Sequence, residues 1–249
     1  MIPKLRRARS TTRGPHGSAR PKRRKVFNQL VENRLISRVS FEEYRSKVRD
    51  VYDGPQGAFL ATCSLVSLHA PLGERFFRKG RFDLRGAKRI LDVGSGAGQL
   101  AKHLIKYADA DAEVICTDLS PEMLRRARNR LNDPRLQFVV ADLSQLPFPD
   151  NHFDCVTCGY VLEHLPEAQL GLAELARVMK PGARMLLLTT EDSISGAMTS
   201  RMWRCRTYNR RELVRTCEQL DLHWNKELWF TPMHKVFRAG GICAELVKR

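Results

Sequence analysis

From Arg89 to the C-terminus, short apolar runs alternate with segments whose apolar residues recur at helical spacing. Repeated strand–helix units with apolar strands are typical of a parallel sheet covered by helices on both faces, with right-handed crossovers. We therefore expect an α/β fold with a doubly wound, mostly parallel sheet. The expected strands span residues 90–93, 113–117, 136–141, 153–158, 183–190, 222–230 and 241–247, and the expected helices follow residues 99, 120, 165 and 208.

The residues before Arg89 have a different composition. Residues 1–25 hold ten basic residues and no acid, and they are rich in Ser, Thr, Gly and Pro. Such a segment cannot bury a core, so we expect a disordered basic tail. The tail explains most of the formal charge of +16, because the other 224 residues carry a net charge of only +6. The composition of residues 1–25 suits a solvated tail, a tether to RNA or an anionic surface, or a mitochondrial transit peptide. We expect residues 26–88 to form an N-terminal helical segment and residues 89–249 to form the main domain.

The cysteines indicate a reducing compartment. There are seven, scattered along the chain, and the basic start is not followed by the apolar stretch of a secretory signal. No apolar run is long enough to cross a membrane. We expect a cytoplasmic protein, with mitochondria as the alternative. Cys155 and Cys158 form a lone pair within an expected strand, and this position favours strand packing over zinc binding.

A glycine-rich turn follows the first expected strand, in the order Asp92-Val93-Gly94-Ser95-Gly96-Ala97-Gly98. Glycines permit a tight turn and close approach of a ligand, and this loop lies where ligands bind in doubly wound sheets. The third glycine comes one residue too early for the dinucleotide fingerprint, which disfavours NAD. The Asp92 carboxylate would repel a pyrophosphate and suits an ammonium or sulfonium group. Asp118 ends the next strand, where a carboxylate can accept from both hydroxyls of a ribose.

Five segments together resemble one family. They are ILDVGSGAGQL (90–100), CTDLSPEML (116–124), ADLSQLPFPDNHFDCV (141–156), YVLEHL (160–165) and LARVMKPGARMLLL (175–188). Their order and spacing resemble the class I S-adenosylmethionine-dependent methyltransferases, and most closely the type 11 small-molecule group that includes quinone-biosynthesis methyltransferases. The resemblance implies a seven-stranded Rossmann-like methyltransferase fold and S-adenosyl-L-methionine as the cofactor.

The resemblance also implies cofactor contacts. The Gly94–Gly98 loop, with Ser95 and Gly96, would hold the amino-acid part, and Asp92 would orient its ammonium. Asp118 would accept from the ribose hydroxyls. The adenine would lie among side chains from the next two strand ends, and Tyr160 would lie near the methyl group. The implied cofactor residues are Asp92, Gly94, Ser95, Gly96, Gly98, Asp118, Leu119, Met123, Asp142, Leu143 and Tyr160.

For the acceptor, His164 is the candidate general base, with capping of the following helix or a bond to a backbone carbonyl as its structural alternatives. Tyr160 is the second catalytic candidate, which could line the pocket or donate a hydrogen bond. Some relatives bind a metal through Glu-x-x-Glu-His, but Tyr160 replaces the first glutamate here, so we expect no metal site. Residues 191–208 are expected to form a cap. Arginines near it could hold an anionic acceptor, contact RNA or face solvent; they are Arg201, Arg204, Arg206, Arg210, Arg211 and Arg215.

The expected function is methyl transfer to the oxygen or carbon of a small aromatic, lipidic or acidic acceptor. An RNA methyltransferase is the first alternative, although no Asn/Asp-Pro-Pro-Tyr/Phe element is present. A non-catalytic scaffold with the same fold is the second, and the intact glycines and acids argue against it.

Overall fold

The computed structural model describes residues 46, 69–193, 196–197, 200, 205–237 and 241–249. All of the described residues belong to one compact unit, Arg38–Arg249. The expectations for the tail 1–25, for most of the helical segment 26–88 and for part of the cap 191–208 therefore lie outside the described residues.

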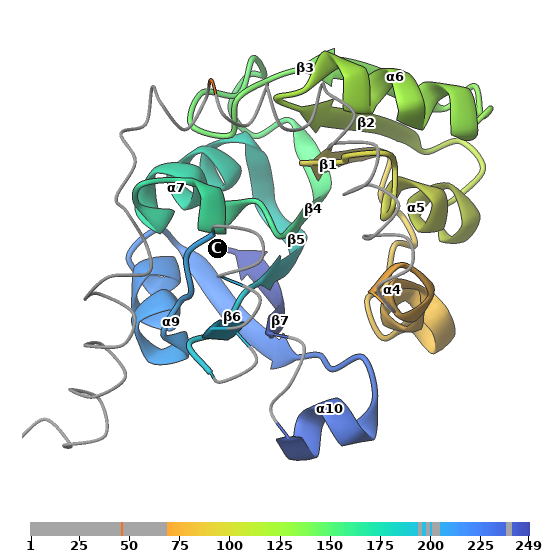
Figure 1. Cartoon of the computed structure of the whole chain (residues 1–249). Coiled ribbons are helices and arrows are strands. Elements are labelled where there is room, and N and C mark those ends of the chain that lie inside the picture. The colour runs from red at the N-terminus through yellow and green to blue at the C-terminus, as the bar shows by residue number, and fades with distance from the viewer. Residues whose placement is uncertain (1–45, 47–68, 194–195, 198–199, 201–204, 238–240) are drawn as a thin grey trace, which may run out of the picture. The chain divides into compact units, whose positions relative to one another are not determined.

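Seven strands form one sheet in the order β3-β2-β1-β4-β5-β7-β6 (Figure 1). The first five strands are parallel, and β7 runs antiparallel to β5 and to β6. The strand order reverses beside β1, so a ligand site is expected beyond the carboxyl ends of β1 and β4. This confirms the doubly wound, mostly parallel fold. The strands are β1 (Arg89–Val93), β2 (Glu113–Asp118), β3 (Leu136–Val140), β4 (Phe153–Gly159), β5 (Met179–Thr189), β6 (Leu222–Glu227) and β7 (Ile242–Lys248).

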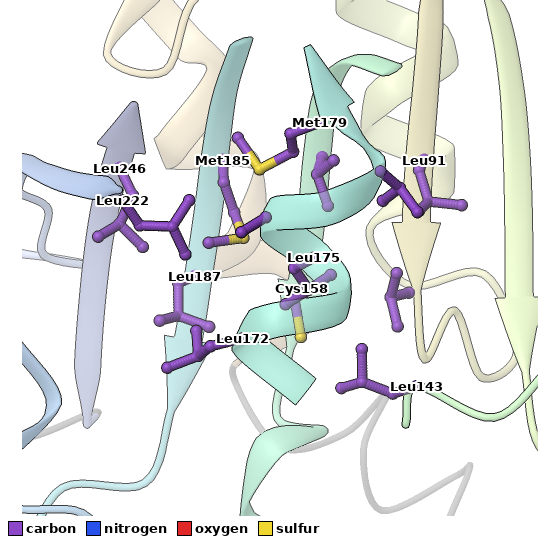
Figure 2. Close-up of a cluster of buried hydrophobic side chains, with 14 of the residues drawn as sticks. Leu91, Leu143, Cys158, Leu172, Leu175, Met179, Met185, Leu187, Leu222 and Leu246 are labelled. Atoms are coloured by element: carbon purple, nitrogen blue, oxygen red, sulfur yellow. The ribbon is translucent and has the colours of Figure 1, made fainter. Parts of the chain in front are cut away.

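Helices pack on both faces of the sheet. Side chains of α4 (His69–Phe77), α5 (Ala101–Tyr107) and α6 (Pro121–Arg130) belong to one buried cluster, and those of α7 (Ala168–Val178) and α9 (Arg210–Glu218) belong to another. Figure 2 shows the second cluster, in which α7 places Leu172 and Leu175 beside Cys158 and Leu187 of the sheet. Three shorter helices complete the described elements: η1 (Arg78–Gly80), η2 (Leu162–His164) and α10 (Pro232–Phe237).

The cysteine pair is confirmed as part of strand β4. Cys155 and Cys158 are both buried free thiols. They are three residues apart on a strand, so their side chains point to opposite faces of the sheet. Accordingly, Cys155 packs in the cluster of α4 and α5, and Cys158 packs in the cluster of α7. They cannot bind one metal ion together.

Two boundaries differ from the sequence prediction. The strand predicted over residues 183–190 begins earlier, at Met179, because residues 180–182 also lie within β5. The register with β4 shifts between Phe153 and Cys155, and the extra residues are accommodated there as an irregularity. The predicted strand 222–230 ends at Glu227, and an unpredicted helix, α10, begins at Pro232. The hydroxyl of Thr231 accepts from the His234 amide at 3.2 Å. A capping threonine followed by proline was the sequence signal for this helix.

Candidate functional site

The glycine loop joins β1 to α5 and depends on glycine for two physical reasons. Gly94 and Gly98 have φ angles of +66° and +80°, which side chains other than glycine rarely adopt. A Cβ on Gly94 would lie 2.0 Å from Cγ2 of Val161, and one on Gly98 would lie 2.5 Å from Cδ1 of Leu131. The loop is therefore held between the β4 end of the sheet and the end of α6, and its conformation is specific.

Asp118 is locked beside this loop. Its Oδ2 accepts from the Gly96 amide at 2.8 Å, and its Oδ1 accepts from the Ser120 amide at 2.9 Å. The Ser95 amide donates to the Thr117 carbonyl at 2.9 Å, so the loop is also attached to β2. The structure thus brings together the ends of β1 and β2, as the sequence predicted. A carboxylate oxygen can accept from more than one donor, so these hydrogen bonds do not prevent Asp118 from accepting from a ligand.

Asp92 is a buried acid at the same edge, with an exposed fraction of 1%. Its Oδ1 accepts from the Thr157 hydroxyl at 2.6 Å, whereas its buried Oδ2 has no hydrogen-bond donor within the described residues. Burial raises the pKa of this carboxyl to about 6, against the opposing effect of Thr157. A cationic donor that reached Oδ2 would satisfy an oxygen that is costly to leave unpaired.

Apolar and polar side chains from the neighbouring strand ends flank the loop. Met123 on α6 is buried against Ala97 of the loop. Leu119 is half-buried. Oδ1 of Asp142 accepts from both the amide and the hydroxyl of Ser144, each at 2.8 Å, so this acid orders the turn after β3. Leu143 differs from its neighbours, because its side chain lies in the core cluster beneath α7 (Figure 2).

Tyr160 follows the last residue of β4 and has a φ of +58°. This left-handed conformation costs roughly 1–2 kcal/mol in a residue with a Cβ, and such strain is often found at functional sites. The Tyr160 amide donates to the Leu188 carbonyl at 2.8 Å, and the side chain packs against the cluster that contains Phe230. Burial raises the pKa of the phenol well above its usual value, so the hydroxyl stays protonated.

Turn η2 carries Glu163 and His164. Glu163 is 3% exposed, and its two carboxylate oxygens accept from the hydroxyls of Thr189 and Thr190, each at 2.8 Å. Burial raises the pKa of Glu163 to about 7 and lowers the pKa of His164 to about 4. At neutral pH the imidazole is therefore uncharged and only weakly basic. Sequence reasoning missed Thr157, Thr189 and Thr190, although hydroxyl residues at the ends of buried strands were a signal.

Arg210 differs from the expectation that it could hold an anion. Its guanidinium donates to both carboxylate oxygens of Glu191, at 3.0 and 2.9 Å, and to Glu227 at 2.8 Å, and it lies over the Trp229 ring. Two carboxylates thus neutralise this arginine. Arg206 donates to the Pro166 carbonyl, Arg211 and Arg215 are exposed, and Arg201 and Arg204 lie outside the described residues.

The described part of the chain has neither a metal-ligand cluster nor a helix that could span a membrane. Among these residues, no group of three His, Cys, Asp or Glu side chains is placed to hold a metal ion. No helix in the same ranges is long and apolar enough to cross a membrane.

Curated proteins similar to this chain match only part of it. This chain is 38% identical over 109 residues to the ubiquinone/menaquinone biosynthesis C-methyltransferase UbiE of Pseudomonas putida (strain F1). The aligned region covers 42% of this chain and 43% of that protein. This chain is 34% identical over 145 residues to the UbiE of Bordetella avium (strain 197N), which covers 57% of each. The chain thus spans about half the length of the curated relatives it matches.

A solved structure with the same fold is magnesium protoporphyrin IX methyltransferase from Synechocystis PCC 6803, whose structure contains bound SAH. The TM-score is 0.65 at 17% identity, over 82% of this chain and all of that one. At this identity the likeness shows the fold alone. Residues 91–187 match the family model described as methyltransferase domain. Residues 91–187 are therefore similar to a methyltransferase domain, and the chain shares its fold with the methyltransferase from Synechocystis.

Proposed function

We propose that this chain is an enzyme that transfers a methyl group from S-adenosyl-L-methionine to a small-molecule acceptor. The observation that carries the proposal is the pair of carboxylates at one sheet edge. Asp92 has a buried oxygen without a donor among the described residues, and Asp118 is oriented by the amide of Gly96. An ammonium and a pair of hydroxyls are the groups that this arrangement can bind.

The residues fit the cofactor group by group. Asp92 would hold the ammonium, and the Asp118 oxygens would accept from the ribose hydroxyls. Met123 and Leu119 would pack against the adenine, and Asp142 would accept from its amino group. Because the side chain of Leu143 is buried in the core, its contribution would come from the main chain. Gly94, Ser95, Gly96 and Gly98 would form the wall around the amino-acid part.

S-adenosylmethionine supplies an electrophilic methyl group on a sulfonium, so the protein needs no covalent nucleophile. Its own residues must orient the acceptor and exclude water, which can contribute several kcal/mol. Tyr160 remains a hydrogen-bond donor because its pKa is raised. His164 would accept or orient an acceptor proton, as an uncharged imidazole whose pKa of about 4 makes it a weak base.

The acceptor that we propose is aromatic or lipidic rather than acidic. Tyr160 packs beside the buried apolar cluster that includes Phe230, and Arg210 is neutralised by Glu191 and Glu227. The similar proteins from Pseudomonas and Bordetella are named as C-methyltransferases, which supports carbon as the methylated atom over oxygen. The six described cysteines are all free thiols, which supports a reducing compartment, the cytoplasm or the mitochondrial matrix. No observation in the described part of the chain favours RNA as the acceptor or a non-catalytic scaffold.

Calorimetric titration of the full chain with S-adenosylmethionine, with NAD as the control, tests the proposal. We expect saturable binding of S-adenosylmethionine alone, and severe weakening in Asp118→Ala. The matched control is Asp133→Asn, since this acid lies before β3 and pairs with Arg135 at 2.8 Å. A folded wild-type chain that bound no S-adenosylmethionine would overturn the proposal.

A further inference from the structure

Turn η2 is attached to the end of β5 through one buried side chain. Glu163 lies in the middle of the turn, and each of its carboxylate oxygens accepts from a different threonine hydroxyl. Thr189 is the last residue of β5, Thr190 follows it, and both are buried. The carboxylate therefore bridges the turn after β4 and the end of the adjacent strand, without facing solvent.

The same turn is held from a second direction by residues 205–208. The Arg206 amide donates to the Glu163 carbonyl at 3.0 Å, and the Tyr208 hydroxyl donates to the Leu162 carbonyl at 2.6 Å. The Tyr208 amide donates to the Thr190 carbonyl at 2.9 Å, which closes a ring of hydrogen bonds among the turn, the end of β5 and this segment. Within the ring, the link from the turn to β5 is made by the Glu163 carboxylate.

We propose that Glu163 is a positioning residue, which fixes turn η2 and thereby His164 against the end of β5. The proposal rests on the proposed function, in which His164 faces the acceptor. It assigns Glu163 neither a base nor a metal-ligand role, because the carboxylate is 3% exposed and both of its oxygens accept from threonines. What the position requires is a hydrogen-bonding group that reaches two hydroxyls, and not a negative charge as such.

This requirement separates two substitutions. Glu163→Gln keeps the shape and can accept from one threonine hydroxyl while its amide donates to the other, since hydroxyls both donate and accept. Glu163→Met keeps much of the volume but offers no adequate partner, and it leaves two buried hydroxyls unpaired. We expect the turn to stay in place in the glutamine variant and to detach in the methionine variant.

The pKa of His164 reports the position of the turn without need of an acceptor. It is lowered to about 4 by burial alone. If the turn detaches, the imidazole becomes hydrated and its pKa should rise toward about 6.5, a change of roughly 300-fold in proton affinity. The titration is followed by NMR of the full-length chain, with the His164 signal assigned from its loss in His164→Gln.

We expect a raised His164 pKa in Glu163→Met, and values near the wild type in Glu163→Gln and in the control Glu167→Met. Glu167 is exposed and its side chain forms no capping hydrogen bond. If Glu163→Met does not fold, Thr190→Val removes one of the two contacts and should raise the pKa by a smaller amount. An unchanged pKa in the folded variants, or an equal rise in Glu163→Gln, would overturn the proposal. The affinity for S-adenosylmethionine, measured separately, should stay within about threefold of the wild-type value in all of these variants. If the wild type itself did not bind S-adenosylmethionine, that result would count against the proposed function alone.

Discussion

The buried carboxyl of Asp92 should lower the free energy of unfolding of the ligand-free protein at neutral pH. The group that would bind the ammonium of the cofactor is costly to bury in its ionised form. Its pKa is raised from 3.8 to about 6, mainly by burial. The native state therefore binds this proton more tightly than the unfolded state does. The contribution of Asp92 to the free energy of unfolding is largest below pH 4, falls as the pH rises through about 6, and stays low above it. At about 1.4 kcal/mol per pKa unit, the loss is about 3 kcal/mol.

Asp92→Asn should remove this pH dependence. The asparagine Oδ1 can still accept from the Thr157 hydroxyl, and the side chain cannot ionise. Part of the gain is offset because the buried amide has no partner either. We expect the variant to exceed the wild type in unfolding free energy at pH 8 by about 1–3 kcal/mol, and to lose this advantage near pH 4. We also expect it to bind S-adenosylmethionine more weakly by roughly 10- to 150-fold, the value of a charge-assisted hydrogen bond.

Urea unfolding at pH 4.5, 6 and 8, followed by circular dichroism, measures the first effect, and calorimetry measures the second. Asp133→Asn is the control with the opposite sign, since its hydrogen bonds with Arg135 lower the pKa of Asp133. The small contribution of Asp133 to the free energy of unfolding should be lost as the pH falls. Parallel pH dependence of the unfolding free energy in the wild type and Asp92→Asn would refute the reasoning, because the ionisation of Asp92 would then have no cost.

Two further substitutions test packing and pairing near the site by urea unfolding. Gly94→Ala should lower the free energy of unfolding by about 2–5 kcal/mol, because residue 94 has a positive φ and the new Cβ would clash with Val161. Gly182→Ala should lose only the part that comes from the backbone conformation, since Gly182 has a φ of +77° and no atom lies within 4 Å of the new Cβ. Equal losses in the two variants would contradict the packing of the glycine loop. Arg210→Met should lower the free energy of unfolding by about 3–5 kcal/mol, because it leaves the carboxylate of Glu191 buried beside an apolar side chain. A smaller loss in the double variant Arg210→Met with Glu191→Gln would identify the ion pair as the cause.

The residues of the site that sequence analysis found are those whose place follows from the local chain. Asp92 and Asp118 end apolar runs, and the carboxyl ends of parallel strands meet at one edge of a sheet. The partners of these acids are a different matter. Thr157 lies 65 residues from Asp92 and becomes its neighbour only through the register of β1 with β4. Apolar runs predict strands, but a two-residue shift in register would leave the same faces buried with other pairs.

The same reasoning explains why a run of arginines did not identify a ligand site. Arg210 lies among several basic residues in sequence, yet its partners are Glu191, 19 residues earlier, and Glu227, 17 residues later. They converge because β5 and β6 both flank β7 and end at the same edge of the sheet. Glu191 follows the end of β5, Glu227 ends β6, and Arg210 begins α9, which leads to the start of β6. The sequence around Arg210 is rich in positive charge, whereas in the fold two carboxylates neutralise the guanidinium of Arg210. Selection of the acceptor by the described residues should therefore depend on apolar contacts and on the hydroxyl of Tyr160, and not on attraction to Arg210.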